Sequence, residues 1–339
     1  MTERPWLAVV GGFLGAGKTT LILAAARELA NRGLKSAVIL NDQGDSLVDT
    51  QHARQNGMDA AEVTGGCFCC RFTDLLDSAQ ELRDDAPDVI FAEPVGSCTD
   101  ISATVLRPLR ERYFEEFRLA PLTVCVDPAR TREIEKSGCN PHLAFLYRNQ
   151  LEEADLVCYT KSDLYPDAPL SDHARCVSAV TGQGVAAWLD ELLSGQLAAG
   201  SRTLDIDYGE YARAEAALAW LNLRATLECR PLISPSMLLG PLVDHIAAGV
   251  HVVHLKALDQ CASGYIKAAV CVNGEEPRIE GDLDASPSRD HEILINLRAA
   301  GDPAQVRAVV EEAMADLRGK ILYHQITCFT PAPPIRPAG

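Results

Sequence analysis

The sequence predicts an α/β fold in which a mostly parallel sheet is covered by helices on both faces, followed by a smaller α+β domain. Three observations favour this class. Apolar, strand-like runs alternate with helix-like segments over residues 6–193, which is the pattern of βαβ units. A glycine-rich motif lies between the first strand and the first helix. Beyond a polar, glycine-punctuated stretch, residues 218–329 contain several strand-like runs but only two helix-like segments, which is typical of an α+β domain.

Composition and charge narrow the class of protein. The 339 residues are 47% hydrophobic, and no apolar run approaches the roughly 20 residues of a membrane span. A net charge of −16 argues against nucleic acid or an anionic membrane as the main partner. Residues 1–5 lack the basic start of a signal peptide. We therefore expect a soluble cytoplasmic protein whose twelve cysteines are not paired in disulfides.

The order of the expected elements defines two domains. In the first, strands are expected at residues 6–10, 37–41, 88–93, 123–127, 155–160 and 175–180, and helices at residues 19–31, 73–82, 100–117, 142–154 and 185–193. In the second, strands are expected at residues 218–228, 252–258, 265–272, 293–297 and 322–329, and helices at residues 236–248 and 303–318. We place the domains at residues 1–198 and 215–330, with a linker at 199–214 and a disordered tail at 331–339.

The motif between the first strand and the first helix has the spacing of a P-loop. Gly12, four further residues and then Gly17-Lys18-Thr19 follow a strand and open a helix, which is the context that the motif requires. Lys18 would reach the outer phosphates of a nucleotide, and the Thr19 hydroxyl would bind a bridging Mg²⁺. The alternative is a glycine-rich turn that binds nothing. The predicted nucleotide-binding positions are Gly12, Phe13, Leu14, Gly15, Ala16, Gly17, Lys18, Thr19 and Thr20. A P-loop NTPase fold is therefore expected.

Acidic residues follow two other strands and are candidates for binding Mg²⁺. Asp42 and Asp45 lie in the polar turn after residue 41, and Glu93 ends the strand at 88–93. A carboxylate there can hold Mg²⁺ directly or through water, and Gly96 would let the backbone move when the outer phosphate is lost. The alternatives are a solvated turn and a surface acid at a strand end. The predicted catalytic residues are Lys18, Thr19 and Glu93, and the predicted magnesium ligands are Thr19, Glu93 and Asp42.

Three thiols in four residues predict a metal site at Gly65-Gly66-Cys67-Phe68-Cys69-Cys70. In a regular strand Cys67 and Cys69 would share a face while Cys70 pointed away, so convergence on one ion requires a turned backbone, which the glycines allow. Thiolates suit Zn²⁺, Cu(I) or Co²⁺, and three of them leave a coordination position open. Buried apolar cysteines, or a redox-active Cys69-Cys70 pair, are the alternatives. The other nine cysteines are interpreted as core residues.

The stretch Thr160-Lys161-Ser162-Asp163 predicts guanine recognition. A carboxylate two residues beyond a lysine can accept hydrogen bonds from N1 and the exocyclic amine of guanine, whereas adenine offers no such donor pair. Asp163 is therefore expected to select GTP over ATP. A second loop, after the strand at 175–180, would contact the carbonyl oxygen of guanine. The predicted base-binding residues are Thr160, Lys161, Asp163, Ser178 and Ala179.

Together these motifs resemble those of the CobW-type GTPases, relatives of the nickel chaperones UreG and HypB. The resemblance covers the whole first domain and, more loosely, the second, which is similar to the C-terminal domain of that family. It implies a GTP-dependent metallochaperone or metal-insertion factor of the kind often described as a cobalamin synthesis protein. It also implies that Cys67, Cys69 and Cys70 bind metal, that Lys18 and Thr19 contact phosphate and Mg²⁺, and that Asp163 reads guanine. Three departures are Thr160 for Asn, Gly65 for Asn, and the lack of a histidine-rich tail.

The leading hypothesis is a GTP-hydrolysing metallochaperone that holds Zn²⁺ or Co²⁺ in its GTP-bound state. After hydrolysis it would release the metal to a client metalloprotein or a corrinoid-related enzyme. One alternative is a regulatory G-protein that guards a cobalamin-dependent or other metalloenzyme and carries a structural metal. Another is a P-loop ATPase or small-molecule kinase in which residues 160–163 are coincidental. No nucleic-acid or membrane partner is expected, and a homodimer is left open.

Overall fold

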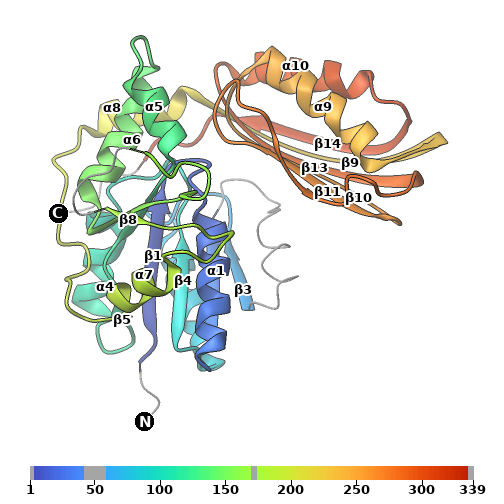
Figure 1. The fold of residues 1–339 in the computed structure, drawn as a ribbon. Helices are drawn as coiled ribbons and strands as arrows, with labels where there is room; N and C mark the ends of the chain where they lie inside the picture. The colour runs from blue at the N-terminus through green and yellow to red at the C-terminus, as the bar shows by residue number, and fades with distance from the viewer. Residues whose placement is uncertain (1–3, 42–58, 169–173, 335–339) are drawn as a thin grey trace. The chain divides into compact units, whose positions relative to one another are not determined.

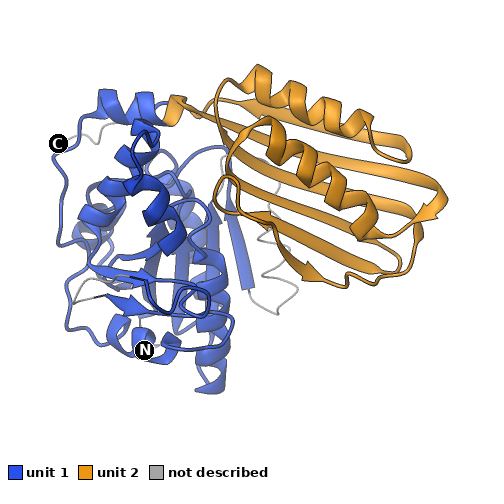
Figure 2. Cartoon of the chain, turned by 45° about the horizontal axis from the view of Figure 1, so that its top comes forward, with its two compact units in different colours: residues 1–214, 333–339 blue, residues 215–332 orange. Residues whose placement is uncertain are grey.

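The computed structural model describes residues 4–41, 59–168 and 174–334. The chain forms two compact units, one comprising residues 1–214 and 333–339 and the other residues 215–332 (Figure 2). Within the described residues, none of the helices combines the length and the hydropathy that a membrane span needs.

The first unit is built on a parallel sheet with the strand order β3-β2-β4-β1-β6-β7-β8, and β5 pairs with the start of β1 (Figure 1). The strands are β1 (Trp6–Gly12), β2 (Ser36–Asn41), β3 (Asp59–Val63), β4 (Val89–Glu93), β5 (Arg118–Leu119), β6 (Thr123–Val126), β7 (Leu156–Tyr159) and β8 (Arg175–Cys176). Every pairing between them is parallel. The carboxyl ends of these strands therefore all lie along one edge of the sheet.

Helices cover both faces of this sheet. The α-helices described between β1 and residue 216 are α1 (Lys18–Asn31), α3 (Phe72–Asp84), α4 (Arg107–Arg112), α5 (Pro128–Glu135), α6 (Pro141–Glu153), α7 (Val185–Leu192) and α8 (Tyr208–Ala216). Apolar residues of α1 and α7 share one core with strand residues such as Val10 and Phe91. The alternate residues Leu7, Val9 and Ile39 are also fully buried, as expected when a parallel sheet is covered on both sides. The predicted α/β class is confirmed.

The second unit is a six-stranded antiparallel sheet with two helices on one face (Figure 2). Its strand order is β12-β11-β10-β13-β9-β14. The elements are β9 (Leu218–Ile233), α9 (Pro235–Gly249), β10 (His251–Cys261), β11 (Gly264–Val270), β12 (Arg278–Gly281), β13 (Ser288–Ala300), α10 (Pro303–Ala315) and β14 (Lys320–Phe329). Every second residue of β9 from Leu221 to Cys229 packs into the core beneath the helices, which is the alternation of a half-buried strand.

Several expected elements differ from the structure. The helix expected at residues 100–117 is a π-helical turn, η1 (Ser102–Leu106), followed by α4, which ends at Arg112. Pro108 lacks the N–H that would continue the α-helical hydrogen bonds from the preceding turn, which accounts for the change of helix type. The strand expected at 175–180 is only β8. The short elements β3, β5, α5, α8 and β12 were not anticipated.

The loop that follows β4 is held in place by side chains of α6 and α8. Glu153 of α6 is 1% exposed and accepts hydrogen bonds from the Thr99 hydroxyl and from the Ser102 N–H, both at 3.1 Å. From α8, the Tyr211 hydroxyl accepts a 3.0 Å bond from the Thr99 N–H. Burial raises the pKa of Glu153 to about 8, although the hydrogen bonds from Ser102 and Thr99 oppose this shift. The carboxyl group is therefore protonated at neutral pH.

This buried acid predicts a pH-dependent stability. Because its pKa is higher in the folded chain than in the unfolded one, the native state binds the proton more tightly, and stability falls as pH rises from about 4.5 through about 8. The free energy of unfolding should drop by about 2–3 kcal/mol between pH 6 and pH 9 through this group. Glu153→Gln should abolish that part of the slope, whereas the exposed neighbour in Glu152→Gln should leave it unchanged. Urea unfolding followed by circular dichroism checks this, and equal slopes in all three proteins would contradict it.

Candidate functional site

The predicted site residues of the first domain gather at the carboxyl edge of its parallel sheet. The P-loop follows β1, Asn41 ends β2, Glu93 ends β4 and Thr160 follows β7. In the register of the sheet, Leu40 pairs with Glu93 and Val9 pairs with Ala92. Ligands of open α/β sheets bind at this edge, so the topology brings together motifs that are far apart in the sequence.

The backbone of the P-loop requires its glycines. Gly15 and Gly17 adopt φ values of 78° and 82°, a region that other residues rarely occupy. A Cβ atom on Gly12 would lie 2.3 Å from the carbonyl oxygen of Cys125. No side chain caps the N-terminus of α1, so the N–H groups of its first turn face the loop, as an anion site requires.

Lys18, Thr19 and Glu93 come together at the start of α1. The Thr19 hydroxyl donates a 3.1 Å hydrogen bond to Oε1 of Glu93, and the Lys18 Nζ lies 3.8 Å from the same oxygen. A hydroxyl and a carboxylate side by side are the hard oxygen donors that Mg²⁺ takes beside phosphate oxygens and water. Lys18 also lies 3.5 Å from the Phe13 carbonyl oxygen, folded over the loop. The three predicted catalytic residues thus fit a phosphate and a Mg²⁺.

Asp42 and Asp45 lie outside the described residues, so their assignment as magnesium or phosphate-sensing residues stays a prediction.

Gly96, three residues after Glu93, packs directly against the P-loop. A Cβ atom on Gly96 would lie 2.8 Å from the Leu14 side chain and 3.0 Å from the Leu14 nitrogen. Movement of the P-loop or of the loop after β4 would therefore displace the other.

Thr160 and Lys161 tie the base-recognition loop to the P-loop. The Thr160 hydroxyl lies 2.7 Å from the Ala16 carbonyl oxygen and 3.1 Å from that of Val126. The Lys161 Nζ donates to the Gly15 carbonyl oxygen at 2.9 Å and forms an ion pair with Asp127. Thr160 stands where the related signature has Asn. The threonine hydroxyl makes a direct contact with the P-loop backbone.

The two loops expected to contact guanine lie side by side. The Ser162 N–H donates to the Val177 carbonyl oxygen at 3.2 Å, and β7 and β8 pair in parallel. Asp163 is exposed, so its carboxylate is open to a base. Ser178 is buried and its Oγ accepts from the Thr181 N–H, which shapes the second loop, while Ala179 is half-buried there.

Cys67, Cys69 and Cys70 converge as the glycine-flanked motif predicts. Their sulfur atoms all lie within 4.8 Å of one another, with separations of 2.6, 3.4 and 3.8 Å. The N–H groups of Cys70 and Arg71 both donate to the Cys67 carbonyl oxygen at 2.9 Å, so the backbone turns here rather than running as a strand. This turn leads directly into α3, whose N-terminus favours negative charge on the thiolates.

Hydrogen bonds among the thiols shift the pKa values of Cys67 and Cys69 in opposite directions. Hydrogen bonds with the thiol of Cys69, and then with that of Cys70, lower the pKa of Cys67. The hydrogen bond with Cys67 raises the pKa of Cys69. The thiolate is the form that binds a metal.

Asn41 is a site residue that the sequence did not reveal. It is 8% exposed, and its Nδ2 donates to the carbonyl oxygens of Val63 and Gly66 at 2.9 and 2.7 Å. Its Oδ1 accepts a 3.0 Å bond from the Phe68 N–H. A polar residue that ends an otherwise apolar strand was the available signal. This single side chain joins the cysteine loop to the end of β2.

These features define a nucleotide-binding P-loop domain with a thiol cluster beside its phosphate edge. Residues 6–183 match the family described as CobW/HypB/UreG, nucleotide-binding domain. The chain belongs to this family, which confirms the resemblance seen in the sequence.

Three curated relatives carry zinc in their names. The zinc chaperone YeiR of Escherichia coli (strain K12) is 32% identical over 158 residues, 46% of this chain and 46% of that protein. The zinc chaperone YjiA of the same strain is 29% identical over 171 residues, 48% and 51% of the two chains. The zinc chaperone CobW of Sinorhizobium sp is 30% identical over 183 residues, 46% and 50%. The chain spans about half the length of the curated relatives it matches.

Solved structures cover more of the chain at lower similarity. The crystal structure of Zn(II)-bound YjiA GTPase from E. coli covers 93% of this chain and 99% of that one, with 16% identity and a TM-score of 0.37.

The position of Asn41 predicts that it supports metal binding without touching the metal. Asn41→Ala removes three hydrogen bonds, two of which hold the cysteine loop at Gly66 and Phe68, and Zn²⁺ affinity should fall by about 10–100-fold. Asn149→Ala removes an amide that bonds to the Phe145 carbonyl oxygen within its own helix, α6, and should leave the affinity unchanged. Competition with a chromophoric zinc chelator measures both, and wild-type affinity in Asn41→Ala would contradict the role.

Proposed function

We propose that this protein is a GTP-hydrolysing metallochaperone that captures Zn²⁺ at Cys67, Cys69 and Cys70 and passes it to a client metalloprotein. The observation that carries the proposal is the placement of the thiol cluster. It is attached through Asn41 to the end of β2, the strand that pairs with β4 and its Glu93. A protein that only stored zinc would have no need of a nucleotide site one strand away.

The nucleotide chemistry follows from the P-loop edge. Lys18 and the N-terminus of α1 would bind the outer phosphates and offset the charge that develops when the bond to the leaving phosphate breaks. Thr19 and Glu93 would hold Mg²⁺, which when bound neutralises charge on the phosphate oxygens. Glu93 accepts a hydrogen bond from Thr19 of the P-loop. Binding of the outer phosphate would therefore affect the start of the loop after β4.

The metal chemistry follows from the donor set. Three thiolates suit zinc in a tetrahedral field, and the names of three relatives support Zn²⁺ over Co²⁺ as the cargo. A site that also opens to a client must bind its ion tightly in one state and weakly in another. Nucleotide hydrolysis supplies the change of state, with the metal held while GTP is bound and released after hydrolysis.

The coupling predicts a nucleotide-dependent metal affinity. The Zn²⁺ affinity of the full chain should be at least about tenfold higher with a non-hydrolysable GTP analogue than with GDP, a coupling in the usual range for linked sites. A chelator competition assay with each nucleotide measures it. Cys139→Ser, which alters a half-buried cysteine away from the cluster, should keep the difference, and the Cys67/Cys69/Cys70→Ser triple variant should lose zinc binding. Equal affinities in the two nucleotide states of the wild type would contradict the proposal.

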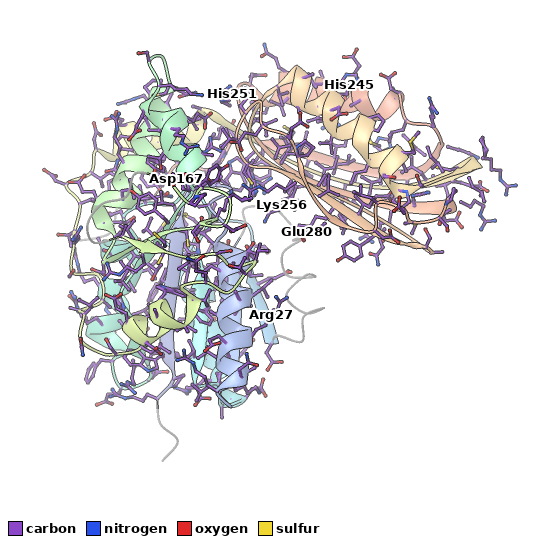
Figure 3. All side chains as sticks on the ribbon, viewed as in Figure 1. Arg27, Asp167, His245, His251, Lys256 and Glu280 are labelled. Atoms are coloured by element: carbon purple, nitrogen blue, oxygen red, sulfur yellow. The ribbon has the colours of Figure 1, made fainter. Side chains whose placement is uncertain are left out.

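Base recognition predicts a change of nucleotide specificity. The Asp163 carboxylate accepts two hydrogen bonds from guanine, whereas Asn offers an N–H donor that suits the C2 carbonyl of xanthine. Asp163→Asn should weaken GTP binding by about 100-fold or more and strengthen XTP binding. Asp167→Asn changes another exposed carboxylate four residues further on (Figure 3) and should leave both unchanged. Fluorescent-nucleotide competition checks this, and ATP binding as tight as GTP binding in the wild type would favour an ATPase instead.

A further inference from the structure

Asp127, the residue that follows β6, holds the lysine of the base-recognition loop. It is 2% exposed, and its carboxylate forms an ion pair with the ammonium group of Lys161, 34 positions further along the chain. The same ammonium donates a 2.9 Å hydrogen bond to the Gly15 carbonyl oxygen of the P-loop. From the sequence, Asp127 was expected only as the end of a strand. The structure gives it a contact with the nucleotide-binding edge.

The backbone of Lys161 depends on support from its surroundings. Its φ of 58° lies in the left-handed region, which residues other than glycine rarely adopt. Its carbonyl oxygen accepts hydrogen bonds from the N–H groups of Leu164 and Tyr165 at 2.9 and 3.1 Å. These two bonds close the turn that contains Asp163. The conformation of Lys161 therefore determines where the carboxylate expected to read guanine is presented.

Burial makes the ion pair important for the orientation of Lys161. Its side chain is only 10% exposed, and an ammonium group that loses its carboxylate at such a place is left as an uncompensated charge. The side chain would then turn toward water and give up its bond to the Gly15 carbonyl oxygen. The Asp127 carboxylate thus keeps Lys161 in the orientation that joins the base-recognition loop to the P-loop.

The helix that begins after Asp127 contacts the same two loops. The second oxygen of the Asp127 carboxylate caps the N-terminus of α5 by accepting a 2.9 Å hydrogen bond. The guanidinium of Arg132 lies 5.2 Å from the centre of the Tyr165 ring in the base-recognition loop. That of Arg130 lies 5.2 Å from the centre of the Phe13 ring in the P-loop. Cations placed over aromatic faces attract them, so α5 supports the arrangement that Asp127 sets.

We propose that Asp127 is a positioning residue for guanine recognition, which fixes Lys161 and, through it, the turn that presents Asp163. The inference rests on the part of the proposed function that assigns guanine recognition to Asp163, and it does not depend on the metal. Contacts to the base are the same in the ground state and in the transition state of hydrolysis. Their loss should therefore weaken nucleotide binding without slowing the bond-breaking step.

Asp127→Asn tests this role because asparagine caps a helix as well as aspartate does. The variant keeps the cap of α5 and loses the charge that holds Lys161. Its Kd for GTP and GDP and its KM for GTP should all rise by at least about tenfold, while kcat stays within about twofold of the wild type. Fluorescent-nucleotide titration and phosphate release measure these constants. Wild-type GTP affinity, or a lower kcat with an unchanged KM, would overturn the assignment.

A matched control makes the same exchange at another helix. Asp302 caps α10 in the second unit through hydrogen bonds from two backbone N–H groups. Asp302→Asn should leave the Kd and the KM for GTP unchanged. A rise equal to that of Asp127→Asn would show that the effect is not specific to the pair with Lys161, and would overturn the proposal.

A double-variant cycle tests whether Asp127 acts through Lys161. Lys161→Met removes the ammonium group and keeps a long side chain. In that background Asp127→Asn should cause no further loss of GTP affinity, because the group that it positions is gone. Losses that add in full would mean that Asp127 acts by another route and would overturn the inference.

Inosine triphosphate separates base recognition from general support of the P-loop. ITP lacks the exocyclic amine of guanine, so the preference for GTP over ITP should narrow in Asp127→Asn as Asp163 loses its position. An equal loss for the two nucleotides would overturn the role in guanine recognition. If the wild type binds ATP as tightly as GTP, the proposed guanine recognition itself fails. If the wild type prefers GTP and Asp127→Asn keeps its full affinity, only the role of Asp127 fails.

Discussion

The parallel pairing of β1 with β4, and of β4 with β2, is the constraint on which the rest of the site depends. It sends the carboxyl ends of three neighbouring strands to one edge, where the P-loop, Glu93 and Asn41 meet. Phosphate binding and thiol binding then share a single rigid frame. In the proposed function, a change at either place would be transmitted through hydrogen bonds and close packing over a few residues rather than across a domain.

The loop after β4 contacts several neighbouring elements of this frame. It starts at Glu93, packs against the P-loop at Gly96 and is bonded by Glu153 of α6. The Tyr211 hydroxyl of α8 also accepts a hydrogen bond from this loop. The second unit begins at Glu215, near the end of α8. One loop is thus in contact with the P-loop, with α6 and with the helix that leads to the antiparallel sheet.

Much of the fold followed from local pattern, and the errors have local causes. The strands beside the P-loop and the strand β9 were expected because apolar alternation is a strong signal, whereas only residues 293–297 of β13 were expected. The break in the helix at 100–117 was missed although Pro108 gave a reason to expect it. The short elements β3 and α5 were missed because five or eight residues carry little periodicity. Within the site, the P-loop, Glu93 and the three clustered cysteines were predicted, while the residues that position them were not.

The sequence by itself determined the residues whose role follows from residue type and spacing. These are the glycines with positive φ, Lys18 and Thr19 at the start of a helix, and the Cys-x-Cys-Cys turn. Each of these is local, since its geometry depends on neighbours within a few positions. Only the tertiary structure decided what Asn41 and Glu153 do. Their partners lie from about 22 to about 50 residues away in the chain, and contacts of that range are set by strand order and packing, which no single stretch of sequence encodes.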